Sequence, residues 1–397
     1  MRFPCLIIFV LLFPVVALAQ NGVITGTVTQ EGTVKPLSRA SVFLSNSSVG
    51  TATSENGTFA LRDIRPGQYT LVVTILGYEN YTKTVLVGRE PIKMNIELAA
   101  KPLMLREVVI SSAADWKKNY DAFKKEFIGT DENAKYCTVV NPHILNLTYN
   151  PTKQILHADA DEFLVVENKA LGYRVKYLLN DFKIDKISGI ISRQGQQVFE
   201  ELPGTEAQKK KWHLKREEAY YGSAMHFYRS LYKGRLKEEG FEVYHLNRHL
   251  NREKPADEVI RRKIQFFREH GMSDSLKRWI TLSGLSKYAN ESLVRPPYQD
   301  FEIVSNSGQA GIYAVHFSNY LYVVYTKRNE MIDYRDLFRD LKMPNYEVSV
   351  VTMQEHTSFF DIDSNGTVLD DAPLYEGAWS RSRISDLLPV DFAPDVK

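Results

Sequence analysis

Short runs of alternating apolar and polar residues fill positions 21 to 98, and turn residues separate them at close intervals. The runs are Val23–Val28, Ala40–Leu44, Thr58–Leu61, Tyr69–Leu76, Tyr81–Val87 and Ile92–Leu98. A period of two places successive side chains on opposite faces of a strand, and frequent turns are typical of an antiparallel β-sandwich. Asn56-Gly57 favours a hairpin turn, and Pro66-Gly67 is a second turn dipeptide. Residues 21–98 are therefore predicted to form an all-β sandwich of about seven strands.

The periodicity changes after residue 112. Trp116, Tyr120, Phe123 and Phe127 recur at helical spacing and predict an amphipathic helix over residues 113–128. Strand-like runs joined by short links come next and predict a β-meander. These runs are 143–149, 155–160, 162–167, 173–182 and 184–192.

The remainder of the chain mixes helical and strand patterns. Charged and aromatic residues over 205–239 predict one or two helices. The elements predicted after them are a strand over Phe241–Leu246, a helix over Ala256–His270, and strands at 301–304, 312–317, 320–326 and 346–354. We interpret residues 113–397 as one larger, β-rich α+β domain, with a split near Pro255 as the alternative.

The first residues of the chain have the pattern of a secretory signal peptide. An apolar run from Leu6 to Leu18 ends in the small-residue pattern Ala17-Leu18-Ala19. Because this run is shorter than the ~20 residues that cross a bilayer, we expect a signal peptide over residues 1–19 rather than an uncleaved anchor. No later stretch of the sequence predicts a transmembrane helix. The chain is therefore expected to be exported, to the periplasm or to the outer membrane.

The order of motifs in the first domain resembles a known family. The segments ITGTV, KPLSRASVFL and GTATSENGTFALRDIRPGQYTLVVTILGYE follow one another within residues 24–80. They are similar to the carboxypeptidase regulatory-like domain, a transthyretin-like sandwich found at the N-termini of exported Bacteroidetes proteins. The resemblance implies an accessory module that hosts no reaction of its own. Residues 99–112 resemble the linker that follows such domains, and could include a strand over Glu107–Ser111.

Three segments of the second region, AFKKEFIG, ENKALGYRVKYLLNDF and GSAMHFYRSL, are similar to exported Bacteroidetes proteins that pair such a region with this domain. This second resemblance implies an architecture and carries no mechanism.

Composition and cysteine content agree with an ordinary globular protein. The chain is 44% hydrophobic and 25% charged, with a formal net charge of +2. This balance gives no electrostatic reason to expect a nucleic-acid partner. Removal of the signal peptide would leave Cys137 as the only cysteine, so no intramolecular disulfide is expected, and its apolar neighbours predict that Cys137 is buried.

Motifs for familiar catalytic chemistries are missing from the sequence. No histidine is followed by glutamate at the third position, so the zinc ligands of carboxypeptidases and zincins are absent, and no GxSxG, Walker, GxGxxG or CxxC motif occurs. His245 and His249 have the closest spacing to a zinc pair, against exposed or locally bonded histidines as the alternative. We predict no catalytic residue, no cofactor-binding residue and no cofactor.

One turn has part of the pattern of a calcium site. Asp361, Asp363 and Asn365 alternate before Gly366, but position twelve of such a loop is Ala372 rather than an acid. A β-turn with side-chain hydrogen bonds is the favoured interpretation, so no metal is predicted beyond this weak calcium candidate. The run Lys209–Lys211 before Trp212 is interpreted as a solvated helix face, with anionic lipid or glycan phosphate as the alternative contact.

Together these patterns favour a non-enzymatic exported protein of the cell envelope. In this interpretation the sandwich is an accessory or docking module for a second domain that binds an envelope protein or a glycan. The alternatives are a hydrolase with a dispersed active site within residues 113–397, and a structural envelope protein.

Overall fold

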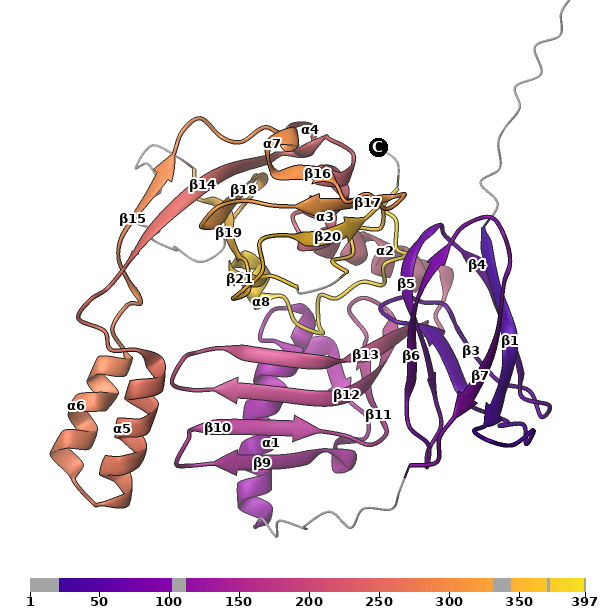
Figure 1. Ribbon diagram of the computed structural model, residues 1–397, viewed down its shortest axis with the longest axis horizontal. Coiled ribbons are helices and arrows are strands. Elements are labelled where there is room, and N and C mark those ends of the chain that lie inside the picture. Colours follow the sequence, from indigo (N-terminus) through magenta and orange to yellow (C-terminus); the bar gives the residue numbers. More distant parts are fainter. Residues whose placement is uncertain (1–20, 102–111, 331–343, 370–371, 396–397) are drawn as a thin grey trace, which may run out of the picture.

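The computed structural model describes residues 21–101, 112–330, 344–369 and 372–395 (Figure 1). The predicted signal peptide and the predicted strand over Glu107–Ser111 lie outside these residues. None of the described helices has the length and apolar character that crossing a bilayer requires.

The N-terminal region is a two-sheet sandwich, as predicted. Its seven strands are β1 Gly22–Gln30, β2 Ser41–Leu44, β3 Gly50–Ala52, β4 Thr58–Ile64, β5 Gly67–Thr74, β6 Tyr81–Val87 and β7 Ile92–Leu98. They form the sheets β4-β1-β7 and β3-β2-β5-β6. Side chains at alternate positions, such as Ile24, Val28, Leu71 and Ile96, are fully buried between the sheets. The apolar alternation in the sequence therefore marks the core correctly.

Two details of the sandwich differ from the expectation. β1 and β7 pair in parallel, because the first and last strands of this region meet side by side and the sequence pattern does not encode the direction of a distant partner. Asn56-Gly57 forms a turn but not a hairpin, since β3 and β4 belong to different sheets. Gly57 has a φ of +71°, which is the backbone property that this dipeptide favours.

A six-stranded sheet follows the sandwich. Its strands are β8 Cys137–Val139, β9 Asn146–Asn150, β10 Ile155–Asp159, β11 Phe163–Asn168, β12 Tyr173–Asp185 and β13 Ile191–Glu201. β12 pairs with β13 along one edge, and β10 and β11 share its other edge. The predicted meander is therefore wrong in its pairing, and the predicted break after residue 182 is absent because β12 continues to Asp185.

The helix over residues 113–128 is confirmed as α1, Ala113–Ile128. The Ser112 hydroxyl begins it by accepting a hydrogen bond from the Asp115 amide. Phe123 and Phe127 lie fully buried against the six-stranded sheet, with ring centroids 4.9 and 5.7 Å from that of Phe182. The stripe of aromatic residues read from the sequence is thus the packing face of the helix.

Residues 205–239 are helical as predicted, but they form three helices rather than one or two. These are α2 Glu206–Tyr220, α3 Ala224–Tyr232 and α4 Leu236–Glu239. They lead into a five-stranded sheet of order β15-β14-β18-β19-β21 and a three-stranded sheet of order β16-β17-β20. The strands are β14 Phe241–Leu250, β15 Tyr288–Val294, β16 Val304–Asn306, β17 Ile312–Val315, β18 Tyr320–Asn329, β19 Tyr346–Thr352, β20 Phe360–Asp363 and β21 Leu374–Gly377. The short helix α8 Ala378–Arg381 follows β21.

Residues 301–304, predicted as a strand, lie mostly in the short helix α7 Asp300–Ile303. The capping contact between the Gln299 amide and the Glu302 side chain begins this turn of helix, and an apolar count over so short a run does not detect such a contact.

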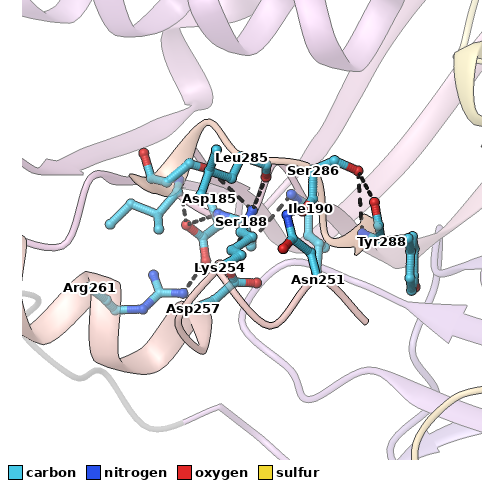
Figure 2. A network of polar contacts seen from close by, with 12 residues as sticks. Asp185, Ser188, Ile190, Asn251, Lys254, Asp257, Arg261, Leu285, Ser286 and Tyr288 are labelled. Carbon is cyan, nitrogen blue, oxygen red and sulfur yellow. Dashed lines mark hydrogen bonds and ion pairs between the residues drawn. The ribbon is translucent and has the colours of Figure 1, made fainter. Parts of the chain in front are cut away.

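A helical hairpin of α5 Asp257–Glu269 and α6 Ser273–Ser283 joins β14 to β15 and projects beside the six-stranded sheet (Figure 1). α6 is not among the elements predicted from the sequence, and none of its residues is buried. Figure 2 shows polar contacts that hold the base of the hairpin: Arg261 lies 2.6 Å from Asp185, and the Lys254 ammonium donates to the carbonyl groups of Ser283 and Leu285. The predicted helix over Ala256–His270 corresponds to α5.

Backbone pairing joins the sandwich to the six-stranded sheet. The Asn46 amide donates to the Gln197 carbonyl at 2.7 Å, and the Phe199 amide donates to the Ser47 carbonyl at 2.9 Å. Beside these bonds, Phe43 and Val72 of the sandwich pack against Leu178 and Val198 in a small buried cluster. We call these contacts the β13 seam.

Residues 383–395, here called the C-terminal strap, contact helix α1, the sandwich and helix α2. The Ile384 amide donates to the Phe127 carbonyl at the end of α1, and the Val390 amide donates to the Asn46 carbonyl of the sandwich. Near its end, the Asp395 amide donates to the Glu217 carboxylate on α2.

Arg229 of α3 binds the strap through buried hydrogen bonds. Its buried guanidinium donates to three carbonyl oxygens, those of Asn365, Val390 and Phe392, at 2.8, 2.7 and 2.9 Å. Each carbonyl would otherwise be buried without a donor from this side, and a buried polar group that lacks a partner costs about 1–3 kcal/mol.

We expect Arg229→Met to lower the free energy of unfolding by about 3 kcal/mol or more, because three carbonyl groups lose their donor. Urea denaturation measures this loss, and limited proteolysis would show earlier cleavage of the strap. Arg235→Met is the control, since Arg235 is exposed and its ion pairs among the described residues are with Glu238 and Glu239. Equal stability of the two variants would contradict the role assigned to Arg229.

Candidate functional site

A cleft of about 710 Å³ lies between α2, the turn that joins β11 to β12, and the 3-10 helix η1 Asn133–Tyr136. Its lining includes Trp212, Tyr136 and a group of charged side chains. A second hollow, over the turn between β16 and β17, is lined by 306 and 308–313 and has no charged residue in its lining. The cleft beside α2 is therefore the better candidate for a binding site.

Trp212 lines the cleft. Its indole N–H donates to the Lys169 carbonyl at 3.0 Å, which fixes the ring against the β11–β12 turn. Gly172 in that turn has a φ of +71°, and a Cβ built there would lie 2.2 Å from the Trp212 ring. Glycine is thus required at this position both by backbone conformation and by the close approach of the indole.

Tyr136 is the accessible aromatic side chain of the cleft, with 59% of its surface exposed. It lies at the end of η1, and the Tyr136 carbonyl accepts a hydrogen bond from the Lys169 amide. The main chain is therefore held in place while the phenol ring faces solvent. An exposed ring on a fixed backbone can stack on a flat apolar surface of a ligand at little entropic cost.

Cationic groups outnumber carboxylates around the cleft. The lining contains Lys169, Arg174, Lys211 and Lys215 against Glu132 and Glu167. Arg174 lies 2.7 Å from Glu167, and Lys135 pairs with Glu132. Among the described residues, no ion pair is found for the ammonium groups of Lys169 and Lys211. These two cations can therefore meet anionic groups of a ligand.

The described lining lacks serine, cysteine and histidine, the side chains that usually supply a nucleophile or a base at neutral pH. Of its two carboxylates, Glu167 is held by a guanidinium and Glu132 by an ammonium group. The arrangement is suited to holding a ligand through stacking, hydrogen bonds and charge.

The calcium candidate lies at the end of β20, away from this cleft. The Asp363 carboxylate, 1% exposed, accepts hydrogen bonds from the Asn365 and Thr367 amides, both at 3.0 Å, and from the Asn365 side chain at 3.1 Å. Burial raises the pKa of Asp363. For Asp363 and Asn365, these contacts are those of a β-turn with side-chain hydrogen bonds, the interpretation favoured from the sequence over a calcium site.

His245 and His249 do not come together. Both lie on β14, where four residues span roughly 13 Å, too far for one zinc ion. The His245 Nε2 atom lies 3.2 Å from the Asn319 side-chain nitrogen, so His245 is locally bonded. Cys137 is buried as predicted, and burial raises the pKa of its thiol to about 12.

The run Lys209–Lys211 divides between two environments. Lys209 pairs with Glu206 on the solvated face of α2, whereas Lys211 lines the cleft beside Trp212. Tyr136 and Arg174 are not predicted as site residues from the sequence, because they are far from α2 in the chain and belong to no motif. The only local signal for the cleft was the charge run that precedes a tryptophan.

Comparison with protein families matches residues 24–110 to the CarboxypepD_reg-like domain. The resemblance drawn from the sequence is thereby confirmed for this domain, and the match extends past the sandwich into the predicted linker. No curated protein sequence matches the chain.

Three solved structures illustrate the structural likenesses. A Bacteroides fragilis protein described as membrane-associated and of unknown function is 10% identical, with 90% of this chain and 98% of that chain covered and a TM-score of 0.18. A Bacteroides uniformis protein described as carbohydrate binding is 8% identical over 46% of this chain and 100% of that chain, with a TM-score of 0.18. A cohesin–X-dockerin complex from Acetivibrio cellulolyticus is 16% identical over 29% and 80%, with a TM-score of 0.20. Scores this low carry no conclusion about fold or function.

His226 is a buried titratable group behind the cleft helix. It is 3% exposed, its Nδ1 atom accepts a hydrogen bond from the Gly222 amide, and its Nε2 atom lies 3.3 Å from the Glu239 carboxylate. Burial lowers the pKa of His226 to about 4, although Glu239 acts in the opposite direction. The folded protein therefore holds this imidazole in its neutral form at physiological pH.

Between pH 6.5 and about 4 the unfolded chain binds a proton at this position and the folded chain does not, so stability is lost as the pH falls. From pH 7 to pH 5, we expect the wild type to lose about 1–2 kcal/mol more than His226→Gln, which cannot be protonated. Urea denaturation at both pH values measures the difference. The exposed His249→Gln should behave as the wild type, and an unchanged pH dependence in His226→Gln would refute this assignment.

Proposed function

We propose that this protein is a non-enzymatic, exported protein of the cell envelope that binds an acidic glycan in the cleft beside α2. The observation that supports this most directly is the cleft itself, which combines the accessible Tyr136 ring with the Lys169 and Lys211 ammonium groups. Its volume of about 710 Å³ is typical of sites that take a small ligand or a few sugar units.

The chemistry of the lining suits sugars. Pyranose rings present flat C–H faces that stack on aromatic rings, and their hydroxyl groups need planar hydrogen-bonding partners. Asn133 and Gln208 line the cleft with amides that also bond to Asp386 and to the Thr205 amide, and the Arg174–Glu167 pair supplies a fixed donor and acceptor. The two lysines without ion pairs would meet uronate or phosphate groups on the glycan.

Export is inferred from the signal-like first residues and from the domain matched over residues 24–110. In this proposal the sandwich is an accessory module. The β13 seam joins it to the six-stranded sheet by main-chain hydrogen bonds, so it would present the cleft in one orientation to the envelope.

Isothermal titration of residues 20–397 with oligogalacturonate, and with maltooligosaccharide as the neutral counterpart, tests the proposal. We expect saturable binding of the acidic chain, and about tenfold weaker binding for Tyr136→Ala, because the stacking surface is lost. Lys211→Gln should weaken binding of oligogalacturonate and should not weaken any binding of maltooligosaccharide.

Phe301→Ala is the matched control, since Phe301 is an exposed aromatic residue outside the cleft lining. Binding that is absent, or equal in Tyr136→Ala and Phe301→Ala, would refute the assignment of the cleft. If the oligosaccharides were shortened during the incubation, and one substitution within residues 113–397 abolished this cleavage, the hydrolase would be favoured instead.

A further inference from the structure

A second cluster lies where the C-terminal strap meets α2. His213 and Glu217 are four residues apart and share one face of the helix, and Asp395 approaches them from the strap. The His213 Nε2 atom is 3.2 Å from Asp395 Oδ1 and 3.8 Å from Glu217 Oε1. All three ligand atoms lie within 4.8 Å of one another.

The electrostatics of this cluster favour a cation. Two carboxylates meet here, and no lysine or arginine within the described chain pairs with either of them. The His213 Nε2 atom is inaccessible to solvent, yet it makes no well-formed hydrogen bond to any described residue. Two carboxylates close to one imidazole nitrogen favour a positive charge at this position, and a bound cation would supply it.

The spacing suits a small divalent ion. Bonds of about 2.0–2.2 Å in tetrahedral geometry place ligand atoms roughly 3.3–3.6 Å apart, and the two distances from Nε2 bracket this range. One imidazole nitrogen and two carboxylate oxygens would leave a fourth position for water, as in zinc sites with three protein ligands.

The strap is already positioned for this role. The Asp395 amide donates to Glu217 Oε1 at 3.1 Å, and Arg229 holds the carbonyl groups of Val390 and Phe392 just before it. The Phe392 ring also lies beside the His213 ring, with centroids 5.8 Å apart. Asp395 therefore reaches the helix from an anchored segment.

We propose that His213, Glu217 and Asp395 bind a divalent transition-metal ion of the zinc class, which fastens the end of the C-terminal strap to α2. The site is separate from the cleft, whose lining on α2 is Gln208, Lys211, Trp212 and Lys215. It does not depend on the proposed glycan.

Titration of the full chain with ZnCl₂ in a chelator-free buffer tests the proposal. We expect one ion per chain with a micromolar or lower dissociation constant, and a rise in Tm with zinc concentration that EDTA reverses. Asp395→Asn and His213→Gln should each weaken binding by at least about tenfold and abolish the rise in Tm. Proteolysis within the strap should slow with zinc in the wild type only.

His249→Gln and Asp274→Asn are the controls, because both remove an exposed potential ligand elsewhere. Asp395 is near the chain end with an 81% exposed side chain, so Asp395→Asn should fold even if His213→Gln does not. Absence of saturable zinc binding, or binding unchanged in Asp395→Asn, would overturn the proposal. Tighter binding of CaCl₂ than of ZnCl₂ would overturn the assignment to the zinc class.

Discussion

The buried guanidinium of Arg229 is the contact on which the arrangement of the chain depends. It has no carboxylate partner among the described residues, and its charge is met by three carbonyl oxygens and by the Tyr220 ring, whose centroid is 5.3 Å away. A buried cation is tolerated only when its donors are satisfied. The turn after β20, the strap and α3 must therefore lie together, because each supplies part of what this one side chain requires.

A second buried arginine holds together the elements that surround the cleft. Arg216 of α2 donates to the Leu171 and Gly172 carbonyl groups at 2.7 and 3.3 Å, and pairs with Glu201 at the end of β13 at 2.6 Å. Its guanidinium also lies 3.8 Å from the centroid of the Tyr173 ring. The β11–β12 turn is thereby fixed against α2, and the distance between the two walls of the cleft is set by a residue that does not line it.

The sequence predicted what depends on local periodicity. Alternation located the sandwich core, and the aromatic spacing of α1 located its packing face. It did not predict the parallel pairing of β1 with β7 or the shared edge of β12, because the choice of partner strand is settled by contacts distant in the chain. The candidate sites were not predicted for the same reason: Tyr136 and Trp212 line one cleft, and His213 meets Asp395, only because segments distant in the chain pack together.

β13 connects the docking of the sandwich with the cleft. The carbonyl of Gln197 and the amide of Phe199 form the seam with the sandwich, and Glu201 at the end of the same strand pairs with Arg216 behind the cleft. A strand that pairs with β12 over most of its length cannot shift by a fraction of a residue without losing its register. A displacement of the sandwich would therefore reach the cleft through a fixed strand and not through a hinge. Such a connection suits a module that orients a binding site, since it transmits position without changing the geometry of the cleft.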